Sequence, residues 1–397
     1  DLVIYSAAIA KDNPERMRAE ELGIPQMERA TLLGQLMEGY RHAINVCGTH
    51  GKTTSTSMLS TVLLDAGRDP SIHIGGEIDM IGGSVHAGSG DTFITEACEF
   101  KASFLTLHPT LALVLNIDED HLDFYKDIHE IEDTFAKFLG QIVPGGMAVL
   151  CGDDVRALSM KQRISVRSVT YGLDNPDCDY TAKDITHDDA MCFSFTPVEH
   201  GVELPRVTLR VPGRHNALNA LGVTAAAREL GLTGEEIARG LDAFAGAHRR
   251  FELTATIEGV KLYHDYGHNP AEFHSVIPLA DAVAGDHRLF VVCQPHTYSR
   301  TKLLFDQYMT CFTGADEVLI TDIYAAREKD PGDIHATMLV DALQKHGVPA
   351  VYTPDFDACE NYLRTHWQPG DVMISLGCGN INLLNEQIAR HEAEKTN

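Results

Sequence analysis

The sequence lacks the features that mark several classes of protein. No apolar run approaches the roughly 20 residues that a membrane-spanning helix needs, so we expect no membrane insertion. Basic residues are few, with 32 Lys and Arg against 57 Asp and Glu, and the formal net charge of -25 gives no broad attraction to nucleic acid. The nine cysteines include no C-x-x-C pair, which favours reduced thiols and a cytoplasmic protein.

The length and the order of the expected elements indicate an α/β protein of more than one domain. A chain of 397 residues exceeds the size at which one hydrophobic core stops growing. Strand and helix patterns alternate along most of it, while short alternating segments between about 166 and 211 predict an antiparallel insertion. With a further boundary in the small-residue stretch 243–247, we expect domains at 1–42, 43–246 and 247–397.

The strongest chemical signal is a glycine-containing segment between an expected strand and an expected helix. It reads Gly48-Thr49-His50-Gly51-Lys52-Thr53-Thr54. Free backbone N–H groups and a helix N-terminus can bind phosphate at such a junction, with Lys52 reaching the terminal phosphates of ATP and Thr53 a magnesium ion. Val46 stands where the common phosphate loop has its first glycine. The competing interpretation is a glycine-rich turn that binds nothing.

This shorter loop resembles the one in Mur ligases and in their relative folylpolyglutamate synthase. Further segments carry a likeness to Mur ligases along essentially the whole chain: 95–99, 116–123, 215–219, 248–252, 265–270, 294–301 and 322–328. The resemblance implies a partial N-terminal Rossmann-like domain for a UDP-sugar, a central P-loop ATPase-like domain with the antiparallel insertion, and a C-terminal Rossmann-like domain for an amino acid. It is closer to the alanine-adding members than to those that add glutamate or diamino acids.

Two polar residues near the phosphate loop are candidate metal ligands. Glu96 ends one expected strand and His121 follows the next. The resemblance implies Mg²⁺ or Mn²⁺ here, with His121 also bordering the substrate, and carboxylate oxygens with one imidazole suit either ion. Phosphoryl transfer needs such cations to neutralise the terminal phosphate. A surface carboxylate and a helix-capping histidine are the alternatives.

The resemblance also assigns contacts to the nucleotide. It implies that Asn216 and Asn219 approach the adenine, that Asp265 meets the ribose, and that Arg250 reaches the terminal phosphate when the domains close. Residues 215–219 serve equally well as a helix cap. The alternative for Arg249 and Arg250 is a pair of solvated arginines at the start of a domain.

The amino-acid site is expected in the last domain. By resemblance, His268 faces the reaction centre, Tyr266 contacts the substrate, and Arg300 is available for the carboxylate of alanine. His268 is a candidate to accept the proton of the amine, because imidazole titrates near neutrality. Asn269 replaces the usual second histidine, and Thr297 stands where some members have arginine.

The reaction implied is the ATP-dependent ligation of L-alanine to the lactyl carboxylate of UDP-N-acetylmuramate through an acyl phosphate. Activation by ATP is needed because forming an amide from a carboxylate is uphill in water. A recycling ligase that attaches a tripeptide to the same sugar nucleotide remains an alternative, as does a nucleotide-binding protein without ligase activity. We expect a monomer or a weak homodimer.

The first residues lead to one further expectation. Asp1 to Tyr5 read as a buried strand, and Ser6 resembles the later part of the sugar-nucleotide site. Complete family members begin with a further strand, a glycine-rich loop and a helix that help to hold the UDP portion. We therefore expect this chain to bind ATP better than UDP-N-acetylmuramate.

Overall fold

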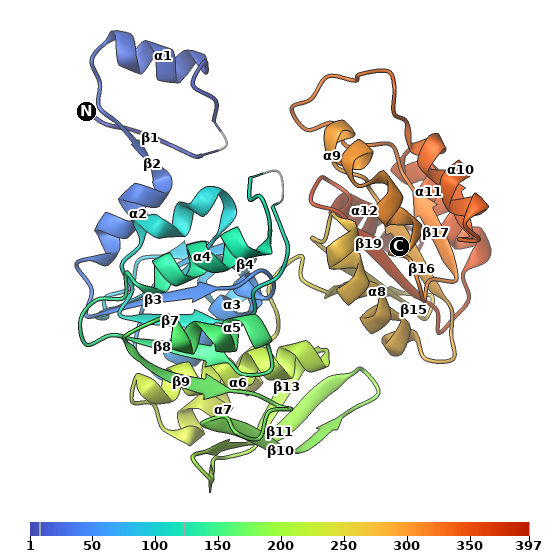
Figure 1. Cartoon of the computed structure of the whole chain (residues 1–397). Coiled ribbons are helices and arrows are strands. Elements are labelled where there is room, and N and C mark those ends of the chain that lie inside the picture. The colour runs from blue at the N-terminus through green and yellow to red at the C-terminus, as the bar shows by residue number, and fades with distance from the viewer. Residues whose placement is uncertain (8, 122–123, 397) are drawn as a thin grey trace. The chain divides into compact units, whose positions relative to one another are not determined.

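A computed structural model describes residues 1–7, 9–121 and 124–396 (Figure 1). The chain divides into two compact units, Asp1–His187 with Cys192–Ala247, and Asp188–Met191 with His248–Asn397. Within the described residues, no helix combines the length and the apolar character needed to cross a membrane. All nine cysteines are free thiols.

The first unit opens with a small α/β element. Strand β1 (Val3–Tyr5) pairs in parallel with β2 (Gln26–Glu28), and helices α1 (Pro14–Glu21) and α2 (Arg29–Met37) follow the two strands. Helix α1 begins after Asn13, because the side chain of Asn13 accepts hydrogen bonds from the N–H groups of Glu15 and Arg16, and a proline occupies the first helical turn.

A large mixed sheet forms the rest of this unit. Its strands are β3 (His42–Cys47), β4 (Ser71–Ile78), β5 (Gly83–His86), β6 (Thr92–Ala97), β7 (Leu111–Val114), β8 (Met147–Cys151), β9 (Arg167–Tyr171), β10 (Tyr180–His187), β11 (Cys192–Glu199), β12 (Val202–Glu203) and β13 (Val207–Pro212). Its helices are α3 (Lys52–Asp65), η1 (Asp79–Ile81), η2 (Phe100–Thr106), α4 (Ile128–Leu139), α5 (Val155–Ser159), η3 (Met160–Gln162), α6 (Arg214–Glu229) and α7 (Gly234–Ala243).

The centre of this sheet determines where ligands can bind. Strand β3 lies between β6 and β7 and is parallel to both. The carboxyl ends of the three strands therefore meet at one edge of the sheet, which is where open α/β sheets bind their ligands.

The predicted antiparallel insertion is present but begins later than expected. Strand β9 pairs in parallel with β8 and so extends the parallel part of the sheet. Antiparallel pairing starts with β10 and β11, and β11 also pairs with β12 and β13. The sequence could not place this start, because a short alternating run fits a parallel or an antiparallel strand equally well.

The second unit is a six-stranded sheet in the order β14-β15-β19-β16-β17-β18. Its strands are β14 (Glu252–Ile257), β15 (Val260–Asp265), β16 (Leu289–Cys293), β17 (Glu317–Ile320), β18 (Ala350–Tyr352) and β19 (Val372–Leu376). Its helices are α8 (Pro270–Ala284), α9 (Tyr298–Leu303), η4 (Phe305–Met309), α10 (Ala336–Lys345), α11 (Phe356–His366) and α12 (Asn382–Thr396). Only the edge pair β14 and β15 is antiparallel among the pairs described.

Helices cover both faces of this sheet, as the uninterrupted apolar strands predict. On one face Val291 of β16 belongs to the same core cluster as Phe273 of α8. On the other face its neighbour Val292 clusters with Leu363 of α11 and Leu384 of α12. Because the sheet is held on both sides, the loops at the carboxyl ends of its parallel strands start from fixed positions.

Candidate functional site

The phosphate loop follows β3 and leads directly into α3. Gly48 and Gly51 have φ angles of 143° and 83°, a region that favours glycine. At Gly48 a side chain would also lie 3.0 Å from the carbonyl oxygen of Asn116. The two glycines are therefore required by the backbone of the loop itself.

Asn116, which follows β7, is hydrogen-bonded to the phosphate loop through its side chain. Its Oδ1 accepts a hydrogen bond from the N–H of His50 at 2.8 Å, and its Nδ2 donates to the carbonyl oxygen of His50 at 3.1 Å. Next to it, the N–H of Asp118 donates to the hydroxyl of Thr49 at 2.8 Å. Asn116 was not among the individual site residues expected from the sequence, although its position just after a parallel strand was a usable signal.

The side chain of Lys52 lies back over its own loop. Its Nζ donates to the carbonyl oxygens of Gly48 at 2.5 Å and Thr49 at 3.0 Å, and lies 3.0 Å from both carboxylate oxygens of Glu99. Burial is the largest single influence on the pKa of Lys52 and acts to lower it, but the charge of Glu99, the hydrogen bond to Glu99 and the neighbouring Cys98 and Glu96 together outweigh it, and the pKa is raised. Lys52 therefore stays protonated.

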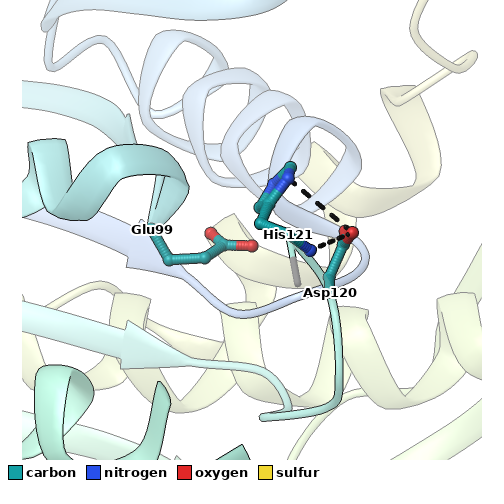
Figure 2. A group of neighbouring side chains, drawn as sticks. All are labelled: Glu99, Asp120 and His121. Carbon is teal, nitrogen blue, oxygen red and sulfur yellow. Dashed lines mark hydrogen bonds and ion pairs between the residues drawn. The ribbon is translucent and has the colours of Figure 1, made fainter. Parts of the chain in front are cut away.

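Glu99, Asp120 and His121 form the group that could hold a metal ion among the described residues (Figure 2). One potential ligand atom from each lies within 4.8 Å of the others. The carboxylate of Glu99 points toward the other two side chains. His121 has a φ of 54°, and its N–H donates to Asp120 Oδ1 at 2.6 Å, so the local backbone turns around the carboxylate of Asp120.

Glu96, selected from the sequence together with His121, lies outside this group. Its Oε1 accepts a hydrogen bond from the N–H of Gly75 on the neighbouring strand β4 at 2.7 Å. A side chain on Gly75 would lie 3.2 Å from the same carboxylate. Thr53, the other expected metal ligand, is buried in the first turn of α3.

The beginning of α6 packs against the phosphate loop. A side chain built on Gly51 would lie 3.1 Å from Asn219 Nδ2, and Asn219 Nδ2 donates to Asn216 Oδ1 at 3.3 Å. Helix α6 has Gly213 at its N-cap and no side-chain cap, so the alternative of a capping role is wrong for Asn216. Its Nδ2 instead donates to the carbonyl oxygen of Pro212 at 2.7 Å.

Ser6 lies in the loop after β1, and its carbonyl oxygen accepts the N–H of Ile9 at 2.9 Å. The ammonium group of Lys101, in η2, donates to the carbonyl oxygen of the adjacent Ala7 at 3.3 Å. A contact therefore links the loop after β1 to the segment that follows β6 and Glu99.

In the second unit, Asp265 at the end of β15 already has two backbone partners. Its carboxylate accepts the N–H of Phe251 at 2.8 Å and the N–H of Gly267 at 2.7 Å. Burial raises the pKa of Asp265, while the charge of Arg250 and these hydrogen bonds act to lower it. Asp265 thus shapes the turn that carries Tyr266 and His268.

His268 stands one residue before the N-cap of α8. Its Nδ1 lies 3.2 Å from the carbonyl oxygen of Tyr266, and its N–H donates to Glu272 Oε2 at 2.7 Å. Asn269, at the position of the usual second histidine, caps α8 by accepting the N–H of Glu272 at 3.0 Å. Burial lowers the pKa of His268, and the nearby charge of Arg300 acts in the same direction.

Arg300 comes from α9, after β16, and lies beside two histidines. Its Nη1 is 3.4 Å from His296 Nδ1, and the ring centres of His296 and His268 are 6.0 Å apart. The ring of His296 stacks on that of Tyr324, with 5.7 Å between the ring centres. Burial, followed by the charge of Arg300, lowers the pKa of His296 to about 4. The structure therefore brings His268 and Arg300 together with His296 and Tyr324, which the sequence analysis did not select individually.

Glu328 anchors the start of α9. Its carboxylate accepts the hydroxyl of Thr297 at 2.7 Å and the N–H of Ser299 at 2.9 Å, and it also bonds the hydroxyl of Ser299. Thr297, which replaces an arginine of some Mur ligases, thus has a partner of its own. The loop after β17 therefore fixes the helix that carries Arg300.

Three family models match most of the chain. The model of the Mur ligase middle domain matches residues 46–227 and that of the Mur ligase, glutamate ligase domain matches residues 249–379. The model of the Mur ligase family, catalytic domain matches residues 1–41.

Relatives of known description are similar over nearly all of the chain. The UDP-N-acetylmuramate-L-alanine ligases of Acetivibrio thermocellus and Caldanaerobacter subterraneus subsp. tengcongensis are each 43% identical over 98% of this chain, which covers 83% and 84% of their lengths. A crystal structure of the UDP-N-acetylmuramate-alanine ligase of Thermotoga maritima matches with a TM-score of 0.83 at 24% identity, over 99% of this chain and 85% of that one.

A more distant likeness is to a murein peptide ligase of Psychrobacter arcticus, with a TM-score of 0.72 at 21% identity over 98% of this chain and 85% of that one. Together with the family matches, these likenesses confirm the three-domain fold expected from the sequence.

Proposed function

The chain belongs to the Mur ligase family, and from this premise we propose that it uses ATP to join L-alanine to the lactyl carboxylate of UDP-N-acetylmuramate in the synthesis of peptidoglycan precursors. The observation that carries the choice of substrate is the identity of 43%, over nearly the whole chain, with relatives described as UDP-N-acetylmuramate-L-alanine ligases. The likeness to the murein peptide ligase rests on fold alone at 21% identity.

ATP is proposed to bind at the loop from Gly48 to Thr54. The N-terminus of α3, with its partial positive charge, is suited to phosphate, and Lys52, in the first turn of that helix, is protonated. Asn219 and Asn216, packed against Gly51, are proposed for the adenine side.

Mg²⁺ or Mn²⁺ is proposed as the cation that neutralises the terminal phosphate. Two carboxylates and an imidazole are ligands of the kind these ions accept, and Glu99, Asp120 and His121 offer them within 4.8 Å of one another. We propose Glu99 in the role that the sequence suggested for Glu96, with Thr53 as an additional ligand, since the carboxylate of Glu96 is bonded to β4.

The remaining contacts with the substrates are proposed to come mainly from the second unit. Arg250 would reach the terminal phosphate and Asp265 the ribose side, while Arg300 would pair with the carboxylate of L-alanine. Tyr266 and His121 would border the substrates, and Ser6 would touch the sugar nucleotide. These roles follow the family resemblance and fit the grouping of residues at the carboxyl ends of parallel strands.

The chemistry divides into two transfers. The lactyl carboxylate attacks the terminal phosphorus of ATP, giving an acyl phosphate and ADP, and the amine of L-alanine then attacks the acyl carbon and expels phosphate. Neutral His268 is the proposed acceptor of the amine proton. Because a carbonyl oxygen only accepts, the contact of Nδ1 with Tyr266 places the ring proton on Nδ1 and leaves the lone pair on Nε2.

One coupled assay of phosphate release tests the proposal. UDP-N-acetylmuramate and ATP are supplied with L-alanine, glycine, L-serine or the tripeptide, and each component is omitted in turn. We expect the greatest turnover with L-alanine and none without the sugar nucleotide. Faster turnover with the tripeptide would transfer the assignment to the recycling ligase, and nucleotide binding without any turnover would indicate a protein without ligase activity.

The remaining properties follow the same proposal. We propose domains at 1–42, 43–246 and 247–397, a cytoplasmic enzyme, and a monomer or weak homodimer. The nine free thiols fit a reducing compartment.

A further inference from the structure

Arg249, next to the arginine proposed for the phosphate, has a different set of partners. Its Nε lies 3.1 Å from His264 Nε2, and its Nη2 donates to the carbonyl oxygens of Gly377 at 3.3 Å and Gly379 at 3.0 Å. Its guanidinium carbon is 4.7 Å from the centre of the Tyr266 ring. The side chain therefore joins two strand ends, that of β15 and that of β19.

The backbone of Arg249 is held as firmly as its side chain. It has a φ of 62°, its N–H donates to Glu252 Oε2 at 2.7 Å, and its carbonyl oxygen accepts the N–H of Tyr266 at 2.7 Å. A non-glycine residue keeps such a φ where surrounding contacts impose it. The backbone bond to Tyr266 and the ring contact act on the same residue.

The hydrogen bonds of His264 define which of its two ring nitrogens carries the proton. It is 1% exposed, and its Nδ1 lies 3.0 Å from the carbonyl oxygen of Ser375. Arginine has only donors, so Nε2 must accept from Arg249 while Nδ1 carries the proton toward Ser375. A neutral imidazole with one defined tautomer thus links β15, β19 and Arg249.

The turn that Arg249 holds borders the amino-acid site. A side chain on Gly379 would lie 2.4 Å from Gln294 Oε1 and 2.8 Å from the ring of Tyr324. Tyr324 stacks on His296, which contacts Arg300. A shift of the turn at 377–379 would therefore reach Arg300 through these packed groups.

We propose that Arg249 is a positioning residue of the amino-acid site: by binding His264 and the carbonyl oxygens of Gly377 and Gly379 and by contacting the ring of Tyr266, it sets the geometry in which Tyr266 and Arg300 receive the amino acid. The inference rests on the proposed function for the identity of that amino acid, L-alanine. Lysine at this position has the charge but not the fork of donors that reaches three acceptors at once.

The test compares Arg249→Lys with Arg364→Lys. Arg364 is a matched control in the same unit, since it donates to the carbonyl oxygen of Ile388 at 3.2 Å and its guanidinium carbon lies 5.8 Å from the centre of the Trp367 ring, away from the site. We expect Arg249→Lys to raise KM for L-alanine at least about tenfold, with KM for ATP and kcat at saturating alanine changed by less than about threefold. Arg364→Lys should lower Tm and leave the two KM values in their original ratio.

A spectroscopic measurement separates failure of this inference from failure of the proposed function. In protein labelled with ¹⁵N-histidine, the His264 signals, assigned by their loss in His264→Gln, should report the Nδ1–H tautomer in the parent chain and a changed Nε2 shift in Arg249→Lys alone. An unchanged Nε2 shift in Arg249→Lys would overturn the inference whether or not the parent chain uses L-alanine. Turnover with L-alanine at the same KM in both arginine variants would overturn it as well.

Discussion

The ammonium nitrogen of Lys52 lies 3.0 Å from both carboxylate oxygens of Glu99, where the two side chains are only 14% and 3% exposed. Lys52 is the proposed partner of the terminal phosphate and Glu99 of the metal ion. Binding of ATP with its cation would therefore require an exchange of partners, in which Lys52 leaves Glu99 for phosphate. The two proposed roles are linked through this ion pair.

Removal of the Lys52 side chain should abolish alanine-dependent release of phosphate. Lys52→Ala removes the cation next to the phosphate loop, while the glycines and Asn116 that shape the loop remain. The far-UV circular dichroism should be that of the parent chain. Lys101→Ala, which removes an exposed lysine bonded to Ala7, serves as the control and should retain turnover. Full activity in Lys52→Ala would contradict the assignment of the phosphate loop.

Two conservative variants distinguish Glu99 from Glu96 as the metal ligand. Glu99→Gln should weaken the apparent affinity for Mg²⁺ at least about tenfold, because it removes a charged oxygen from the group with Asp120 and His121. Glu96→Gln keeps an oxygen that can accept the N–H of Gly75 and should change the Mg²⁺ dependence by less than about threefold. Turnover is measured against Mg²⁺ at saturating ATP. The opposite ranking of the two variants would restore Glu96 as the ligand.

Glu328 should affect the use of L-alanine without touching it. Glu328→Gln weakens the bonds to Thr297 and Ser299 at the start of α9, so we expect KM for L-alanine to rise about three- to tenfold with KM for ATP unchanged. Asp333→Asn is the control, because it removes only the exposed ion pair with Lys302 of α9 and should change neither value. Equal changes in KM for L-alanine in the two variants would argue against a specific role of Glu328 in fixing the start of α9.

Acid should destabilise the second unit through His264. Burial, followed by the charge of Arg249, lowers the pKa of His264 to about 4 from an ordinary 6.5. Below pH 6.5 His264 becomes protonated in the unfolded chain but stays neutral in the folded chain. The contribution of neutral His264 to the free energy of unfolding is therefore present above that pH and is lost as the pH falls toward about 4.

The expected loss of unfolding free energy from His264 is roughly 2 kcal/mol between pH 7.5 and pH 5.0. Urea denaturation at the two pH values measures it. His264→Gln does not titrate and can still accept from Arg249, so it should show a decline smaller by about that amount. The same decline in both proteins would mean that other groups account for the acid sensitivity.

Much of the arrangement could be predicted because it depends on local patterns. The run from Ala43 to Val46 followed by Gly48 and Gly51 indicated a strand, a phosphate-binding turn and a helix, and the structure has β3, the loop and α3 in that order. Tyr266, His268 and Arg300 follow parallel strands, and the order of strands in the sheet then brings His268 and Arg300 together.

The remainder depends on which way a side chain points and on which distant group it meets. Glu96 and Glu99 are three residues apart and both acidic, but Glu96 lies within β6 and is bonded across to β4, while Glu99 lies beyond the strand and turns toward His121. Local periodicity carries no information about that choice. Arg249 and Arg250 presented the same difficulty, because the acceptors of Arg249 at Gly377 and Gly379 lie far along the chain.

The position of His268, one residue before the N-cap of α8, has an electrostatic consequence. The aligned peptide dipoles of a helix leave partial positive charge at its N-terminus, and α8 begins at Pro270 with Asn269 as its cap. This field opposes the arrival of a proton on the imidazole, in the same direction as burial and the charge of Arg300, while Glu272 in the first turn acts against it. The helix thus helps to keep a basic lone pair available at neutral pH, and it does so through its backbone, whatever side chains its outer surface carries.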